Sequence, residues 1–189
     1  MTTAGSFLGR LVELLDDSGA PYMVAGSFAS TYHGVPRTTQ DIDIVVELTP
    51  TSLKRLLARL PDDDYYVSEG AAADAVRRRG QFNVIDLETG WKADLIVRKQ
   101  RAFSLEEFGR RQPAELEGVP VFLATAEDTV LAKLEWSKAS GSERQLRDVA
   151  GVLRVAGDQL DNEYLERWAG VLEVEEQLAR ARALDAAAI

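Results

Sequence analysis

Two aspartates, Asp41 and Asp43, stand two residues apart in the apolar segment 41–48. Residues two apart on a β-strand project from the same face, and a rise of about 3.3 Å per residue puts their backbone positions roughly 6.5–7 Å apart. Asp94 interrupts a second apolar segment, residues 92–97, where an unpaired buried carboxylate would cost several kcal/mol. The sequence therefore predicts that cations meet all three carboxylates.

The chain offers only oxygen ligands in number for a metal ion. It has no cysteine and one histidine, which excludes a thiolate site and leaves too few nitrogen ligands for a typical zinc centre. Hard oxygen ligands favour Mg²⁺, Mn²⁺ or Ca²⁺, and Mg²⁺ is the ion most often shared with substrate phosphates. Asp86, in the neighbouring segment 82–87, is an alternative to Asp94 as the third carboxylate; the longer and more apolar strand around Asp94 favours Asp94, but the sequence alone does not show which of the two faces the site.

Gly26 and Ser27 follow the short apolar run 22–25 and precede a predicted helix at 28–33. The free N–H groups at the start of a helix, together with a serine hydroxyl, are a common place for a phosphate to bind. Gly26 would allow a phosphate to approach the backbone closely. The alternative is that Ser27 only caps the helix, which is compatible with phosphate binding.

These residues require a mixed α/β scaffold. The pattern predicts a helix through 7–15, strands at 22–25 and 41–48, a helix after Thr49, an antiparallel hairpin formed by 82–87 and 92–97, and a strand at 119–123. From Thr125 onward the pattern is helical. We expect an α/β (α+β) core at 1–124, with a small mixed sheet, helices on one side and the metal site at its edge, and a C-terminal helical bundle at 125–189.

Finer features of the pattern give further expectations. Residues 61–80 are predicted to form a loop with at most a short helix. Ser104 with Glu107, and Ser142 with Gln145, have the spacing of capping boxes at helix starts. His33 is predicted to be structural.

Composition limits the function classes. The net charge of −9 argues against non-specific coating of nucleic acid, although three basic clusters, 77–79, 98–101 and 110–111, leave room for a local site. No run approaches the roughly 18 apolar residues of a membrane span, and the first 17 residues lack the pattern of a signal peptide. We therefore expect a cytoplasmic protein that does not enter the membrane.

The order of these motifs is informative. Gly26-Ser27, the strand-borne Asp41-Ile42-Asp43 and a later strand with Asp94 resemble the motif of the nucleotidyltransferase superfamily, which has the DNA polymerase β-like fold. The fuller segment 26–43, GSFASTYHGVPRTTQDID, looks like the bacterial branch of AbiEii-type toxin enzymes. The resemblance is strongest over residues 20–97.

The resemblance implies roles for particular residues. Asp41 and Asp43 would bind two Mg²⁺ ions, with Mn²⁺ possible, and Asp94 would be the third ligand and the base that activates the acceptor hydroxyl. Gly26, Ser27, Arg37 and Thr39 would contact the nucleoside triphosphate. Lys133 would meet the triphosphate and Asp148 would contribute to activity. The alternatives are an exposed helix lysine at 133 and a surface pair of Asp148 with Arg144.

The implied activity is transfer of a nucleoside monophosphate from an NTP to an acceptor hydroxyl. The first expected acceptor is an RNA end such as a tRNA 3′ terminus, with toxin-type growth inhibition and a cognate antitoxin protein as partner. The alternatives are a small hydroxylated compound such as an antibiotic, a protein hydroxyl, or a catalytically silent nucleotide-binding module.

Overall fold

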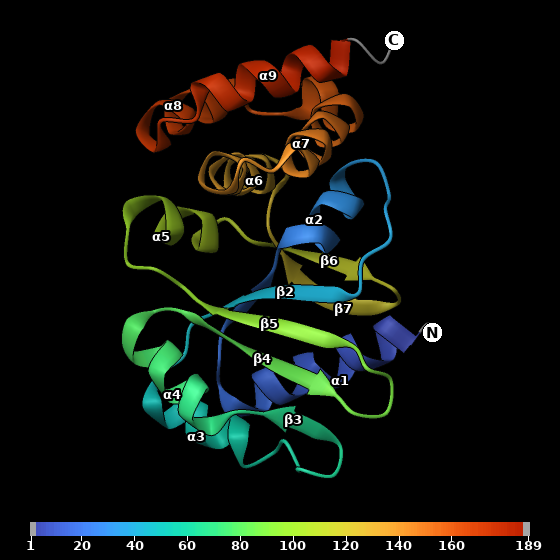
Figure 1. The fold of residues 1–189 in the computed structure, drawn as a ribbon, viewed down its shortest axis with the longest axis vertical. Coiled ribbons are helices and arrows are strands. Elements are labelled where there is room, and N and C mark those ends of the chain that lie inside the picture. Colours follow the sequence, from blue (N-terminus) through green and yellow to red (C-terminus); the bar gives the residue numbers. More distant parts are fainter. Residues whose placement is uncertain (1–2, 187–189) are drawn as a thin grey trace. The chain divides into compact units, whose positions relative to one another are not determined.

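The computed structural model describes residues 3–186, which form two compact units (Figure 1). The first unit comprises the chain up to Ala25 together with Thr39–Leu123. The second comprises Gly26–Thr38 together with the chain from Ala124 onward. The segment Gly26–Thr38 therefore groups with the helices that follow residue 124 in the sequence.

The first unit is built on a seven-stranded mixed sheet with the order β3-β4-β5-β2-β1-β7-β6. Strands β2 and β5 pair in parallel, as do β1 and β7, and all other neighbours are antiparallel. The strands are β1 (Tyr22–Val24), β2 (Asp41–Val46), β3 (Tyr65–Val67), β4 (Gln81–Asp86), β5 (Lys92–Val97), β6 (Gln112–Leu116) and β7 (Val119–Leu123).

The central strands alternate between two environments. In β2, Ile42, Ile44 and Val46 are fully buried, whereas the residues between them are partly or largely exposed. Strand β5 repeats this alternation in register, because Ile42 lies opposite Ala93 and Ile44 opposite Leu95. Branched apolar residues on one face thus form the core of the unit and leave the other face to polar side chains.

The described residues of this unit form four helices: α1 (Thr3–Ser18), α3 (Pro50–Leu57), α4 (Glu69–Arg78) and α5 (Ala102–Gly109). Helix α1 packs against α3 and β7, α3 packs against α4, and α4 packs against β4. Helix α3 begins as the sequence predicts, with Thr49 accepting a bond from the Ser52 amide and Pro50 at the first position.

The second unit is helical. It contains α2 (Gly26–His33), α6 (Ala126–Ser140), α7 (Glu143–Ala156), a short 3₁₀ helix (Gly157–Gln159), α8 (Asn162–Leu172) and α9 (Glu175–Ala186). Helix α2 packs on α6 and α7. A Cβ added to Gly34, just after α2, would lie 2.8 Å from the Val152 nitrogen, so only glycine allows this close approach to α7.

The predicted fold class is confirmed: the sheet is mixed, the 82–97 hairpin is present as β4 and β5, and the chain is helical beyond residue 125. Two strands were not predicted. Strand β3 lies in the expected loop at 61–80, and β6 is a five-residue strand that contains a proline. The capping box at Ser104 is wrong, because α5 begins two residues earlier and Ser104 instead accepts a bond from Arg101 Nε.

Among the described residues, we find no helix of the length and apolar character needed to span a membrane.

Candidate active site

Three of the predicted carboxylates lie together on one face of the sheet. In the parallel pair β2 and β5, Asp43 lies directly opposite Asp94, and Asp41 lies opposite Lys92. Since residues two apart on a strand share a face, these four residues form a two-by-two array. The array lies on two central strands, near the residues at which they begin. The three carboxylates therefore lie on two central strands, on the polar face of the sheet, and not on an edge strand.

Lys92 is the only cation of this array. Its Nζ lies 3.3 Å from Asp41 Oδ1 and 3.3 Å from each oxygen of Asp94. Partial burial of Lys92 lowers its pKa. The hydrogen bonds and charges of Asp94 and then Asp41 raise the pKa by more than burial lowers it, so the net shift is upward. The ammonium group thus bridges the first and third carboxylates.

The fit of this array to a divalent ion can be tested on Asp94. Its Oδ1 is buried and accepts no hydrogen bond from any residue in the described range 3–186, although Lys92 Nζ is near. A buried carboxylate oxygen without a donor is a costly arrangement that a cation would relieve. Within the same range, no group of three or more Asp, Glu or His side chains is already gathered as a metal site. The three carboxylates and the buried Asp94 Oδ1, which accepts no hydrogen bond within this range, fit Mg²⁺ or Mn²⁺ as ligands. Without a metal ion, Lys92 contacts two of the three carboxylates.

Asp86, the alternative third carboxylate, faces the other side of the sheet. Its neighbour Ile85 lies opposite Lys92, so Asp86 points away from the array. There it is buried, pairs with Arg10 of α1 at 2.8 Å and accepts a hydrogen bond from the Thr89 hydroxyl. The geometry therefore favours Asp94 as the companion of Asp41 and Asp43.

The start of β2 and β5 also carries a small hollow of about 150 Å³, lined by Gln40, Thr89, Gly90 and Trp91. Gln40 and Trp91 directly precede Asp41 and Lys92 in the chain. A larger groove of about 900 Å³ runs between α3 and α4, and its lining residues include none of the array. Of these two hollows, the small one is formed by residues that adjoin the array in the chain.

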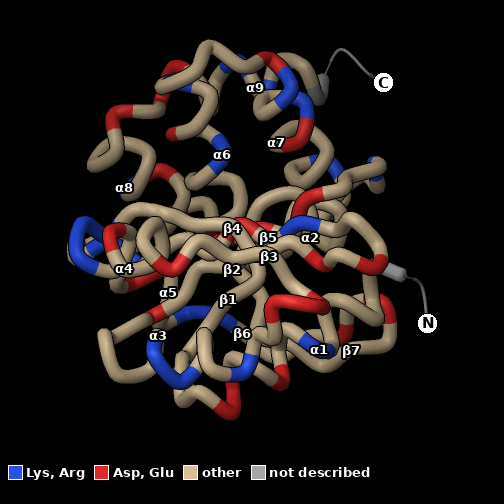
Figure 2. Tube along the Cα trace, turned by 60° about the horizontal axis from the view of Figure 1, so that its bottom comes forward, with Lys and Arg blue, Asp and Glu red and all other residues tan. Residues whose placement is uncertain are grey.

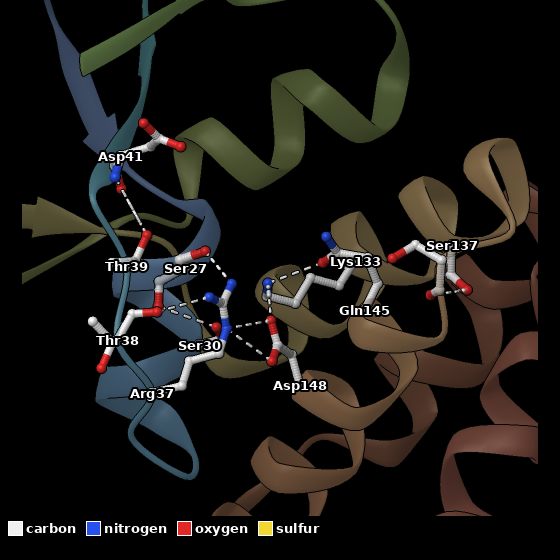
Figure 3. A network of polar contacts seen from close by, with 11 residues as sticks. Ser27, Ser30, Arg37, Thr38, Thr39, Asp41, Lys133, Ser137, Gln145 and Asp148 are labelled. Carbon is white, nitrogen blue, oxygen red and sulfur yellow. Dashed lines mark hydrogen bonds and ion pairs between the residues drawn. The ribbon is translucent and has the colours of Figure 1, made fainter. Parts of the chain in front are cut away.

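The second unit contains a cluster of charges, in which Lys133 is buried and Arg37 and Asp148 are partly buried (Figure 3). Lys133 on α6 donates to Asp148 Oδ2 of α7 at 2.8 Å and to Gln145 Oε1 at 3.1 Å. Arg37 reaches the same aspartate from the segment after α2, with its Nε 3.1 Å from both carboxylate oxygens. The Arg37 guanidinium also donates to the Ser27 hydroxyl. Two cations and one carboxylate therefore meet at the first turn of α2.

This cluster answers several of the open alternatives. Lys133 is buried, so the alternative of an exposed helix lysine does not hold. Asp148 forms ion pairs with Lys133 and Arg37, so the alternative of a surface ion pair with Arg144 does not describe it. The Ser142 capping box is also wrong, because the Ser142 side chain makes no capping bond and Gln145 binds Lys133 instead.

The remaining predicted site residues are placed as follows. Gly26 opens α2 with a φ of 57°, a left-handed conformation that favours glycine. The Thr39 hydroxyl donates to the Asp41 carbonyl at 3.2 Å and so shapes the entry to β2 (Figure 3). His33 Nε2 donates to the Ala124 carbonyl at 2.8 Å, and burial lowers its pKa, with the bond to Ala124 and the charge of Glu127 opposing.

The basic clusters are largely engaged within the first unit. Arg77 and Arg78 both pair with Asp74 on the same helix, so basic and acidic residues adjoin along α4 (Figure 2). Arg79 donates to the Arg98 carbonyl at 2.8 Å. Arg98 is buried and pairs with Glu47 at 2.5 Å. These pairs reduce the positive charge that the clusters present to a nucleic acid.

Two features of the site were missed from the sequence. Lys92 was not singled out, although its position two residues before Asp94 on a strand places it on the same face. The link between Arg37 and Asp148 joins residues 111 positions apart, and no local pattern carries that information.

Comparison with known proteins supports the fold. No protein-family model matches the chain, and no curated protein matches its sequence. Among solved structures, the antibiotic-resistance factor ANT(2'')-Ia in complex with adenylyl-2''-tobramycin is 15% identical, with a TM-score of 0.59 over 91% of this chain and 98% of that chain.

Two further structures show the same likeness. An antigenic nucleotidyltransferase-like protein from Paracoccidioides brasiliensis is 16% identical, with a TM-score of 0.56 over 96% of this chain and 93% of its own. The lincosamide antibiotic adenylyltransferase LnuA, in its lincomycin-bound form, is 12% identical, with a TM-score of 0.52 over 80% of this chain and 96% of its own. At these identities the similarity establishes the fold, which this chain shares with nucleotidyltransferases.

Proposed function

We propose that this protein is a metal-dependent nucleotidyltransferase that moves a nucleoside monophosphate from an NTP to an acceptor hydroxyl. The observation that carries the proposal is the register of Asp43 with Asp94, beside Asp41, on a fold shared with nucleotidyltransferases. Three carboxylates on one polar face, one of them with an orphaned buried oxygen, fit divalent cations.

Each residue has a role in this proposal. Asp41, Asp43 and Asp94 would hold Mg²⁺, or Mn²⁺ in its place. When bound, these ions stabilise the attacking and leaving oxygens of an in-line displacement. Asp94 would also accept the proton of the acceptor hydroxyl, because a carboxylate within hydrogen-bond reach can act as a general base.

The family resemblance implies phosphate contacts from Gly26, Ser27, Arg37, Thr39 and Lys133. Gly26 and Ser27 present the N-terminal amides of α2, an eight-residue helix, and anions bind at such positions. Arg37 and Lys133 supply positive charge, and Asp148 holds both cations in place. Thr39 sets the entry to β2 through its bonds with Asp41.

Two acceptor classes follow from different observations. The resemblance to the AbiEii-type branch leads to an RNA or tRNA 3′ end, with growth inhibition and a cognate antitoxin partner. The net charge of −9, together with arginines that pair within the protein, favours a small cationic hydroxylated compound. ANT(2'')-Ia and LnuA, whose structures contain an adenylylated or bound antibiotic, share this fold.

A labelling experiment tests the proposal. Each of four α-³²P-labelled NTPs is incubated with the protein and Mg²⁺, and with total cellular RNA, the protein alone or tobramycin as acceptor. Label that appears on one acceptor and is lost in Asp43→Ala supports the proposal and identifies the acceptor. NTP binding without label on any acceptor would favour a silent nucleotide-binding module.

The toxin role has its own test. If RNA is labelled, induced expression should arrest growth, and Asp43→Ala should not. Continued growth with RNA labelling intact would remove the toxin role and the need for an antitoxin.

A further inference from the structure

Lys92 lies among the carboxylates of the candidate site. It lies on β5 two residues before Asp94 and directly opposite Asp41 on β2. Its ammonium group contacts Asp41 and both oxygens of Asp94 at 3.3 Å. The lysine is therefore inside the group of carboxylates to which the proposed function assigns the metal ions.

The charges of the array explain why a cation is needed there. Asp41, Asp43 and Asp94 carry three negative charges on neighbouring positions of two paired strands. Like charges at such positions repel one another, and the repulsion increases as they become buried. The side chains of Asp94 and Lys92 are 16% and 31% exposed, whereas that of Asp41 is 53% exposed, so the shielding from water is strongest at Asp94. One ammonium group offsets a third of this negative charge.

We propose that Lys92 is a tethered counter-ion that holds Asp41 and Asp94 in position without metal and competes with divalent cations for them. The inference rests on the proposed function, since it concerns the same carboxylates. Metal binding at Asp41 and Asp94 requires the ammonium group to move away, and its long flexible stem allows this. Lys92 is thus a positioning residue that sets how tightly the site takes up metal.

The geometry separates this role from that of an ordinary surface ion pair. A surface lysine that pairs with one aspartate contributes little and can be replaced without consequence. Lys92 contacts two carboxylates from two different strands, and one of the oxygens it approaches, Asp94 Oδ1, accepts no hydrogen bond within residues 3–186. Lys92 attracts that oxygen electrostatically but does not donate a hydrogen bond to it, so a divalent cation could bind the oxygen more strongly than Lys92 does.

Direct Mn²⁺ binding, measured by electron paramagnetic resonance on the full chain without nucleotide, tests the proposal. We expect Lys92→Met to bind Mn²⁺ about tenfold more tightly than the wild type, which is about 1.4 kcal/mol, because the ammonium group that competes for Asp41 and Asp94 is removed. Lys92→Arg, which keeps the charge, should stay close to the wild type.

Controls distinguish the possible failures. Lys54→Met removes an exposed lysine of α3 and the same unit charge, and it should leave Mn²⁺ affinity unchanged. Equal or weaker Mn²⁺ binding by Lys92→Met would overturn the counter-ion role. Mn²⁺ binding that survives Asp43→Ala would instead overturn the metal site of the proposed function.

A second readout covers the case in which Lys92→Met folds poorly. Lys92→Gln keeps a polar side chain of similar length and removes the charge. Its thermal midpoint should be lower than that of the wild type without metal, and it should gain more from added Mn²⁺. An equal gain in both proteins would count against competition between Lys92 and the metal.

Discussion

Asp94 and Asp86 lie on neighbouring strands and face opposite sides of one sheet. Asp86 points into the core and pairs with Arg10, which comes from a helix 76 residues away in the chain. Asp94 lies on the polar face and contacts Lys92, which is two residues away. The first carboxylate is fixed by tertiary packing, and the second is held by a cation that can leave. The same residue type is therefore structural on one face and available for chemistry on the other.

The largest expected effect is the loss of nucleotide transfer when a carboxylate of the polar face is removed. Asp43→Ala should reduce transfer of labelled nucleotide about 1,000-fold, roughly 4 kcal/mol of transition-state stabilisation, because the proposed metal ligand opposite Asp94 is lost. The free energy of unfolding should change little. Transfer assays on the acceptor found by labelling, together with urea unfolding, measure both quantities.

Asp86→Asn is the matched control for this variant. It removes a carboxylate from the same sheet but from the packed face. Its transfer rate per folded molecule should equal that of the wild type. Equal loss of transfer in both variants would erase the distinction between the faces.

The second prediction concerns the stability lost when the ion pair of the packed face is removed. Arg10→Met should lower the free energy of unfolding by about 3 kcal/mol, because the Asp86 side chain, 2% exposed, would be buried without its cation. Lys92→Met on the polar face should cost less than about 1 kcal/mol, since Asp94 can be partly hydrated. Urea unfolding of the two variants gives the comparison directly. Similar losses would show that the two faces do not differ in this way.

The third prediction extends the comparison to the cluster of the second unit. Asp148 has two cations, so Lys133→Met or Arg37→Met alone should cost about 1–2 kcal/mol of unfolding free energy. The double variant should lose about 1 kcal/mol more than the sum, because Asp148 would then lack a cation. A double-mutant cycle measured in urea tests this, and additive losses would argue against a shared partner.

The smallest expected effect concerns His33. Burial lowers its pKa in the folded protein below the ordinary 6.5, so the unfolded chain binds the proton more readily. The free energy of unfolding should therefore be highest above pH 6.5 and fall as the pH drops through that value toward the lowered pKa. His33→Gln, which can still donate to the Ala124 carbonyl, should show a flatter profile. Parallel profiles from urea unfolding between pH 5 and 8 would refute this assignment.

Much of the fold follows from local patterns. Apolar alternation and capping residues predicted β2, β4, β5 and the start of α3, because these elements are stabilised by residues near one another in the chain. Strand β3 was missed because its three residues, Tyr65–Val67, are too few to show an alternating pattern. Strand β6 was missed because it contains Pro113 and polar residues, and it forms by pairing with β7.

The site divides in the same way. The shared face of Asp41 and Asp43 follows from strand periodicity alone. The pairing of Asp43 with Asp94 depends on how β2 meets β5, and the role of Gln145 depends on how α6 meets α7. Such contacts between distant residues leave no local pattern in the sequence. The local spacing of Ser142 and Gln145 therefore predicted a capping box that does not form.

The chain passes between the two units three times, after Ala25, Thr38 and Leu123. A protease cut near Thr38 would therefore yield two pieces that each contribute to both units, with β1 and α2 on the shorter one. The pairing of β1 with β2 and β7, and the packing of α2 on α6 and α7, should keep the pieces together until denaturant is added. Separately expressed pieces with these ends are natural candidates for fragment complementation, whereas a fragment that stops near residue 124 would leave α2 without the helices that bury it.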